Sequence, residues 1–245
     1  ICRATVDGAV WITHLKPRPA GEKTFKLPAA MVLGDALAQV PESAAAWMVP
    51  DASRTWADIR YEESNRVGYL YFDFYNGAMS TDQCVRLMEA YRFAQSRDTR
   101  VIVLMGGSDF WSNGIHLNLI EVADSPAEES WRNINAMNDL AQAIITTDTH
   151  LTISAMRGGA GAGGAFLALA ADRVYARDGA ILNPHYKGMG NLYGSEYWTY
   201  LLPRRVGAAQ ARTLTQNRLP ISTRTAKRLG LIDDHFGTGP GDFQE

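Results

Sequence analysis

The chain is predicted to adopt an α/β fold in which most strands pair in parallel. Two observations carry this prediction. From residue 67 onward, apolar stretches of strand length alternate with longer stretches that carry a helical apolar pattern, an order typical of parallel sheets. In addition, the run VIVLMGG at 101–107 is apolar throughout, as expected for a strand that is covered on both faces.

Residues 1–55 are expected to lie outside the main domain. Apolar positions alternate over residues 1–28 around an Asp-Gly turn signal, which predicts a hairpin and a loop, and residues 31–49 carry a helical apolar pattern. Because two strands do not form a domain alone, we interpret 1–55 as the end of a preceding β-rich region with a linker. The second domain, 56–245, is expected to be truncated at its C-terminus, since the chain starts without Met and ends in GTGPGDFQE.

The main domain is expected to contain alternating strands and helices, of which the first helix has a hydroxyl residue as its N-cap. In chain order these are a strand at 68–76, a helix at 81–96 capped by Thr81, a strand at 101–107, a loop and helix within 110–122, a helix at 129–147, a strand ending at Met156, a short helix at 165–171 and a strand at 173–176.

Composition excludes several classes of protein. The 245 residues include 24 Lys and Arg and 26 Asp and Glu. The resulting formal net charge of −2 gives no general attraction to nucleic acid or membrane surfaces. No apolar run approaches the ~18 residues that span a bilayer. Cys2 and Cys84 are isolated, so we expect no metal site and no disulfide framework, which is typical of the reducing cytoplasm.

Five glycines cluster between residues 158 and 164, after an apolar strand and before a short apolar helix. Glycine permits sharp turns and lets a ligand approach main-chain N–H groups, which have no partners within the helix at its start. Three interpretations are open: close packing of strand and helix, a dinucleotide site, or a site for an oxyanion. Gly159–Gly164 matches G-x-G-x-x-G, with Asp178 about twenty residues further on, which is the weak signature of a Rossmann-type NAD oxidoreductase.

A second junction of the same kind favours the oxyanion interpretation. In VIVLMGGSDFWSNGIHLN an apolar strand breaks at two glycines, and a helix is expected to start near Gly114, about fifty residues before the glycine cluster. Two junctions that direct N–H groups at one point form an oxyanion hole, which stabilises the charge on a thioester carbonyl oxygen. A dinucleotide site needs only one such junction.

These two segments, together with ADRVYARDGAILNPHYKG, resemble the crotonase (enoyl-CoA hydratase/isomerase) superfamily over roughly residues 60–236. The resemblance implies a spiral of β-β-α units that binds a coenzyme A thioester. It implies an oxyanion hole formed by the N–H groups of Ile115 and Gly163. The residues that it implies around coenzyme A are Ser112, Asn113, Gly114, His116 and Gly164.

Departures from the family pattern are informative. Phe166 stands where hydratases carry one catalytic Glu, and His185, beside Tyr186, stands where they carry the second, so addition of water to an enoyl thioester is not expected. His116 replaces the family Asp after the first glycine loop. Glu196 is then the carboxylate placed to return to the site, and we expect Tyr186, Glu196 and His185 to be the catalytic candidates.

The segment PHYKGMGNLYGSEYWTYLLPRRVG resembles one branch of this superfamily, the HypX/HoxX hydrogenase-maturation proteins, and the N-terminal hairpin resembles the end of their formyltransferase region. The branch implies conversion of formyl-CoA to carbon monoxide and coenzyme A, with the carbon monoxide becoming a ligand of nickel–iron hydrogenase. Its implied partners are the formyltransferase region of the same protein and hydrogenase-maturation proteins. The alternatives are a non-catalytic module that binds acyl-CoA or a partner, or the NAD oxidoreductase.

Overall fold

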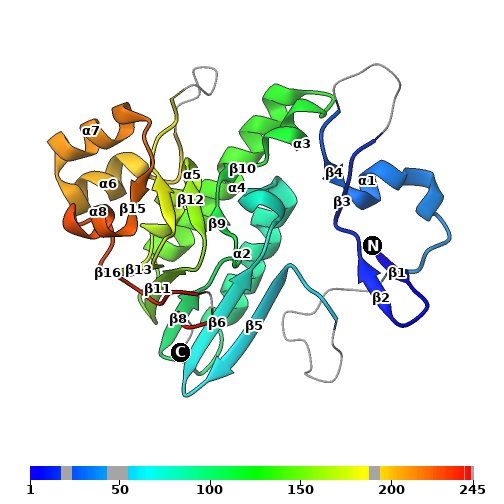
Figure 1. Ribbon diagram of the computed structural model, residues 1–245, viewed down its shortest axis with the longest axis horizontal. Coiled ribbons are helices and arrows are strands. Elements are labelled where there is room, and N and C mark those ends of the chain that lie inside the picture. The colour runs from blue at the N-terminus through cyan, green and yellow to red at the C-terminus, as the bar shows by residue number, and fades with distance from the viewer. Residues whose placement is uncertain (18–23, 43–54, 188–193, 240, 244–245) are drawn as a thin grey trace.

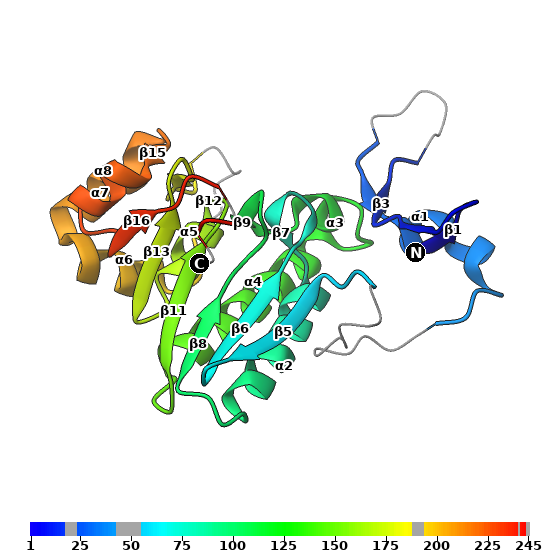
Figure 2. The ribbon, with the colours of Figure 1, turned by 60° about the horizontal axis from the view of Figure 1, so that its bottom comes forward.

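A computed structural model describes the chain except residues 18–23, 43–54, 188–193, 240 and 244–245 (Figure 1). The largest sheet of the described part has six strands, and Figure 2 shows them side by side in chain order. Only the first pair is antiparallel. The strands are β5 (Ile59–Ser64), β6 (Val67–Phe72), β8 (Val101–Leu104), β11 (Leu151–Met156), β13 (Arg173–Arg177) and β16 (Asp234–Phe236).

A second sheet runs beside the first and also follows chain order. Its strands are β9 (Phe110–Ser112), β12 (Gly159–Gly161), β14 (Ile181–Asn183) and β15 (Ile221–Ser222). Each of the strands β8, β11 and β13 in the large sheet therefore continues into the next strand of the second sheet before the chain returns. This is the predicted spiral of β-β-α units, and the α/β prediction is confirmed.

The same topology shows that the dinucleotide interpretation is wrong. A doubly wound sheet binds its cofactor at the crevice where the strand order reverses direction. Neither sheet of the described chain contains such a reversal, because both strand orders are strictly sequential. The glycines that match G-x-G-x-x-G lie instead in β12 and at the start of α5, within the spiral of β-β-α units.

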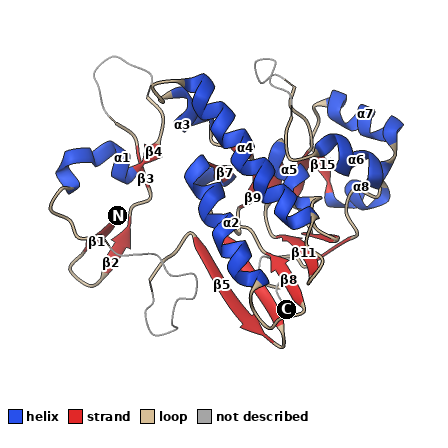
Figure 3. Cartoon of the chain, turned by 180° about the vertical axis from the view of Figure 1, so that it is seen from behind, coloured by secondary structure: helices blue, strands red, loops and turns tan. Residues whose placement is uncertain are grey.

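Helices complete the units. α2 (Thr81–Gln95) and α4 (Pro126–Ile145) pack against each other and lie side by side in front of the large sheet in Figure 3. Their apolar faces meet the sheet through fully buried side chains such as Leu87, Tyr91 and Leu140. The remaining helices of the main body are α3 (Leu117–Glu121), α5 (Gly163–Ala168), α6 (Trp198–Val206), α7 (Ala208–Asn217) and α8 (Thr223–Arg228). Within the described residues, no helix has the length and apolar character needed to cross a membrane.

The first residues form a separate small group beside the main body, at the right of Figure 1. The predicted hairpin is present as β1 (Cys2–Ala4) and β2 (Ala9–Trp11). A second pair, β3 (His14–Leu15) with β4 (Leu27–Pro28), precedes α1 (Ala29–Leu33). The helix expected over 31–49 is shorter. α1 ends at Leu33, just before Gly34, whose φ is +44°, and a short 3-10 helix covers Gly34–Leu37; residues 43–54 lie outside the described part.

Local details differ from the sequence predictions. The strand expected at 68–76 ends at Phe72, and a 3-10 helix covers Tyr75–Gly77, while the short helix expected at 165–171 runs from Gly163 to Ala168. The N-cap of α2 is Ser80 rather than Thr81; its hydroxyl accepts from the Gln83 N–H, while the Gln83 side chain accepts from the Ser80 N–H. The loop expected within 110–122 contains β9 and the two-residue strand β10 (Gly114–Ile115), which pairs with β7 (Ala78–Met79), so the helix α3 starts at Leu117 rather than near Gly114.

Candidate active site

The two glycine junctions lie against each other. A Cβ on Gly114 would lie 3.2 Å from the Gly163 nitrogen, and a Cβ on Gly164 would overlap the Ser112 carbonyl. Glycine is therefore required at Gly164 for β9 to pass the start of α5 so closely. Gly163 is the first residue of α5, follows Ala162 at a φ of +45°, and its N–H has no partner inside the helix.

Tyr186 and Glu196 form a hydrogen-bonded pair beside this junction. The Tyr186 hydroxyl donates to Glu196 Oε2 at 2.5 Å and also lies 3.3 Å from the Ser195 carbonyl oxygen. Glu196 is only 1% exposed. A Cβ on Gly163 would overlap the Glu196 carboxylate, so the carboxylate lies directly against the second glycine junction.

Burial dominates the electrostatics of the pair. It raises the pKa of Glu196 above its usual range, and the hydrogen bond from Tyr186 only partly offsets this. The pKa of Tyr186 is raised well above its ordinary value by burial and by the neighbouring carboxylate. An ionised Glu196 in this environment is a stronger base than an exposed one, while Tyr186 keeps its proton.

Aromatic side chains enclose the pair. The Phe166 ring stacks on Tyr186 with 5.3 Å between centroids. Trp198 packs on Phe166, with 6.0 Å between those two centroids. Phe166 is completely buried and carries no polar atom. Phe166 and Trp198 thus form an aromatic wall on the Tyr186 side of the pair.

The other predicted residues are placed differently. His185 is directed at its own loop, since its Nδ1 accepts from the Lys187 N–H at 3.0 Å. Ser112 is fully buried; its hydroxyl accepts from the Gly114 N–H and contacts Met79 Sδ. The Asn113 amide donates to the Asn76 carbonyl.

His116 is 4% exposed, and its Nδ1 accepts from the Leu119 N–H. The main-chain N–H of His116 donates to Oδ1 of Asn133. Asp178, the acidic residue of the dinucleotide interpretation, is instead bonded to His235.

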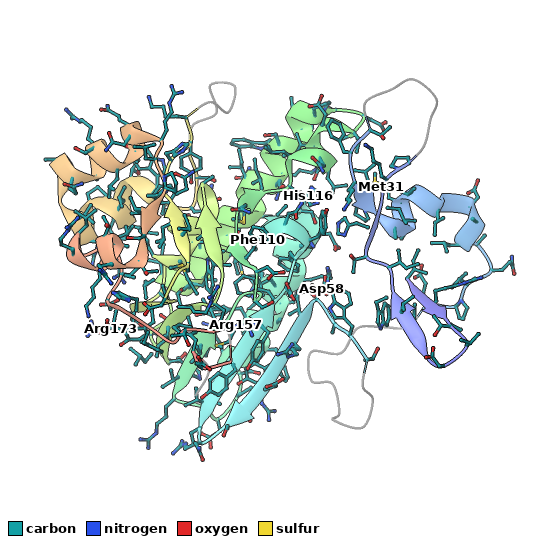
Figure 4. All side chains as sticks on the ribbon, viewed as in Figure 1. Met31, Asp58, Phe110, His116, Arg157 and Arg173 are labelled. Carbon is teal, nitrogen blue, oxygen red and sulfur yellow. The ribbon has the colours of Figure 1, made fainter. Side chains whose placement is uncertain are left out.

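A cavity of about 930 Å³ separates the N-terminal group from the main body and was not foreseen from the sequence. His116, Phe110 and Asp58 line its main-body side, which faces the N-terminal residues around Met31 in Figure 4. His14 of the N-terminal group stacks on Tyr75 of the main body, with 4.3 Å between the ring centroids. Burial, aided by His116, lowers the pKa of His14 to about 4. No sequence pattern reveals this cavity, because its two walls come from separate parts of the chain.

No group of three or more His, Cys, Asp or Glu side chains that could hold a metal ion occurs among the described residues.

Comparison with known proteins assigns the chain to a family. Residues 76–238 match the enoyl-CoA hydratase/isomerase family, and the chain belongs to this family. It is also a homologue of hydrogenase-maturation factors: it is 57% identical over 233 residues to the hydrogenase maturation factor HoxX of Bradyrhizobium diazoefficiens, covering 95% of this chain and 39% of that protein.

Solved structures from the same comparison also match this chain. HypX from Aquifex aeolicus, crystallised with tetrahydrofolic acid, matches with a TM-score of 0.95 and 51% identity over 99% of this chain and 43% of that one. An enoyl-CoA hydratase from Bacillus halodurans matches with a TM-score of 0.69 and 22% identity over 77% of this chain and 76% of that one, which shows the shared fold alone. The chain thus spans about two fifths of the length of HoxX and HypX.

Proposed function

We propose that this chain binds a coenzyme A thioester and converts formyl-CoA to carbon monoxide and coenzyme A. The observation that carries the proposal is the buried Tyr186–Glu196 pair, joined by a 2.5 Å hydrogen bond and lying against Gly163. The homology to HoxX and HypX supports a role in hydrogenase maturation, in which the carbon monoxide becomes a ligand of the nickel–iron centre.

The reaction breaks the C–H and C–S bonds of the formyl thioester and forms an S–H bond. The N–H groups of Ile115 and Gly163 are proposed to bind the carbonyl oxygen, which makes the formyl C–H more acidic. Glu196, whose pKa is raised by burial, accepts the formyl proton, and Tyr186 contacts and orients the formyl group. The proton is then delivered to the departing thiolate, so the pair returns to its starting state and no co-reactant is consumed.

The aromatic wall fits this chemistry. Formyl thioesters are readily hydrolysed, and a water molecule held beside the carbonyl would divert the reaction to formate. Phe166, which by the resemblance stands where hydratases carry one of the carboxylates that activate water, and Trp198 present apolar rings on the Tyr186 side of the pair. The formyltransferase region of the longer relatives is the proposed source of the thioester.

Carbon monoxide trapping by haemoglobin tests the proposal. The chain supplied with formyl-CoA should release carbon monoxide, and Tyr186→Phe and Glu196→Gln should each slow the release by about 10²–10⁴-fold, the usual contribution of an acid/base group. Affinity for coenzyme A should change little. If both variants stay within a few-fold of the parent, the pair is not catalytic and His185 becomes the candidate.

A non-catalytic module that binds acyl-CoA is the second candidate. It is favoured by Phe166 and His185, which replace both hydratase carboxylates. Such a module would bind coenzyme A and release no carbon monoxide, so the same assay, together with a coenzyme A binding measurement, separates the two functions.

A further inference from the structure

Glu196 adopts a strained backbone conformation. Its φ is +54°, as is that of Tyr197, and neither residue is glycine. Left-handed backbone at non-glycine residues is uncommon and persists only where surrounding contacts enforce it. The conformation directs the Glu196 carboxylate toward Gly163 and Tyr186, so whatever enforces it also determines the geometry of the acid/base pair.

One contact from a distant part of the chain holds this backbone. The Glu196 N–H donates to Oδ1 of Asn138 at 2.7 Å, across 58 residues of sequence. Asn138 lies in α4, and its helical neighbours Met137 and Leu140 are at most 1% exposed in the core. The acceptor oxygen of Asn138 is therefore held by a long helix packed in the core, whereas Glu196 itself lies outside any helix or strand.

The same helix holds the other half of the site. Asn133, 1% exposed and five positions before Asn138, accepts from the His116 N–H at 3.1 Å and donates to the Met79 carbonyl at 2.9 Å. His116 directly follows Ile115, the proposed oxyanion donor. Two amides of α4 thus fix the two segments that must meet around the thioester.

We propose that Asn138 is a positioning residue for Glu196: its side-chain oxygen holds the left-handed backbone that aligns the carboxylate with the Tyr186 hydroxyl and with the glycine junction. The effect of Asn138 on rate rests on the proposed function, whereas its effect on the geometry of Glu196 does not. The role requires only an acceptor at Oδ1, because the bonded group is an N–H.

This requirement predicts a pattern among variants. Asn138→Ala removes the acceptor, and displacement of a catalytic group by about 1 Å costs on the order of 10²-fold in rate. We expect kcat for carbon monoxide release to fall by about this factor and KM for formyl-CoA to change less than about twofold. Asn138→Asp keeps an oxygen acceptor of the same shape, so it should keep the Glu196 backbone in place; its negative charge raises the Glu196 pKa further, so kcat should recover to within about fivefold of the parent only at higher pH.

Asn135→Ala is the matched control. Asn135 lies on the same helix, donates only to the Trp131 carbonyl of the preceding turn, and contacts neither half of the site. It removes the same side chain at the same cost in helix propensity, and kcat and KM should remain unchanged.

Crystal structures of the Ala and Asp variants provide a readout that does not depend on activity. We expect Glu196 to leave the left-handed region and to lose its bond to Tyr186 in Asn138→Ala, and to keep both in Asn138→Asp. The inference is overturned if Glu196 keeps its φ and its bond in the Ala variant, if Asp fails to restore them, or if Asn135→Ala lowers kcat equally. Absence of carbon monoxide release by the parent chain would instead refute the proposed function, and the structures would still decide the role of Asn138.

Discussion

Removal of the Tyr186 hydroxyl separates the packing of this ring from its chemistry. In Tyr186→Phe the ring remains and can keep its stacking on Phe166, so the apolar contacts are retained. What is lost is the 2.5 Å hydrogen bond to a carboxylate that is only 1% exposed, together with the longer 3.3 Å contact to the Ser195 carbonyl oxygen. The variant should therefore affect both the stability and the rate, mainly through the shorter of these two contacts, the bond to the Glu196 carboxylate.

The expected stability change follows from the type of bond. A hydrogen bond to a charged group contributes about 1.5–3 kcal/mol. For a chain of this size, 1 kcal/mol corresponds to a shift in Tm of roughly 2–4 °C. Tyr186→Phe should thus lower Tm by about 3–12 °C at a pH where Glu196 is ionised.

The pH dependence has a defined sign. The bond from Tyr186 lowers the pKa of Glu196, so its loss raises that pKa further. As the pH falls through the pKa of Glu196, the carboxyl takes up a proton and no longer needs a donor. The difference in Tm between the parent and the variant should therefore be largest in alkaline buffer and should shrink on acidification.

Thermal melting at several pH values and carbon monoxide release from formyl-CoA are measured together on the same preparations. Tyr200→Phe is the matched control, because Tyr200 is 48% exposed and its hydroxyl is bonded to Arg204 at the surface. The reasoning is refuted if Tyr186→Phe melts like the parent at every pH, or if Tyr200→Phe loses as much stability and activity.

Three further predictions concern neighbouring groups. Glu196→Gln should raise Tm in neutral and alkaline buffer, because burial raises the Glu196 pKa and the buried charge therefore destabilises the folded state there. Thermal melting should show that this gain in Tm vanishes as the pH falls toward the ordinary pKa of a glutamate side chain. Gly163→Ala should abolish carbon monoxide release because its Cβ would overlap the Glu196 carboxylate, whereas Gly8→Ala, in open space, should not. Ser80→Ala should cost about 0.5–2 kcal/mol in urea unfolding and more than Thr81→Ala, and the reverse order would contradict the assignment of Ser80 as the N-cap.

Local signals explain why much of the fold could be predicted. The strand at Val101–Leu104 and the helix at Pro126–Ile145 have long, clear apolar patterns, and glycine clusters mark both junctions. The sequence predicts the N-cap of α2 one residue too late because Ser80 and Thr81 both carry a suitable hydroxyl, and only the Gln83 contacts distinguish them. The two-residue strand β10 has no pattern of its own and depends on its partner β7.

The site was less accessible to sequence reasoning. The pairing of Tyr186 with Glu196 is expected from the resemblance to a protein branch, since no residue spacing predicts a contact between the two ends of a glycine-rich sequence segment. Nothing in the sequence indicates that Asn138 reaches Glu196, because the contact depends on how α4 crosses the spiral. The cavity beside His14 likewise exists only once the N-terminal group docks on the main body.

The fate of the formyl carbon tests the central claim most directly. Formyl-CoA labelled with carbon-13 is incubated with the chain, and labelled carbon monoxide, labelled formate and free coenzyme A thiol are quantified together. The account predicts carbon monoxide and thiol in equal amounts, at a rate that Glu196→Gln strongly reduces. Labelled formate in place of carbon monoxide, or binding of coenzyme A without turnover, would contradict it.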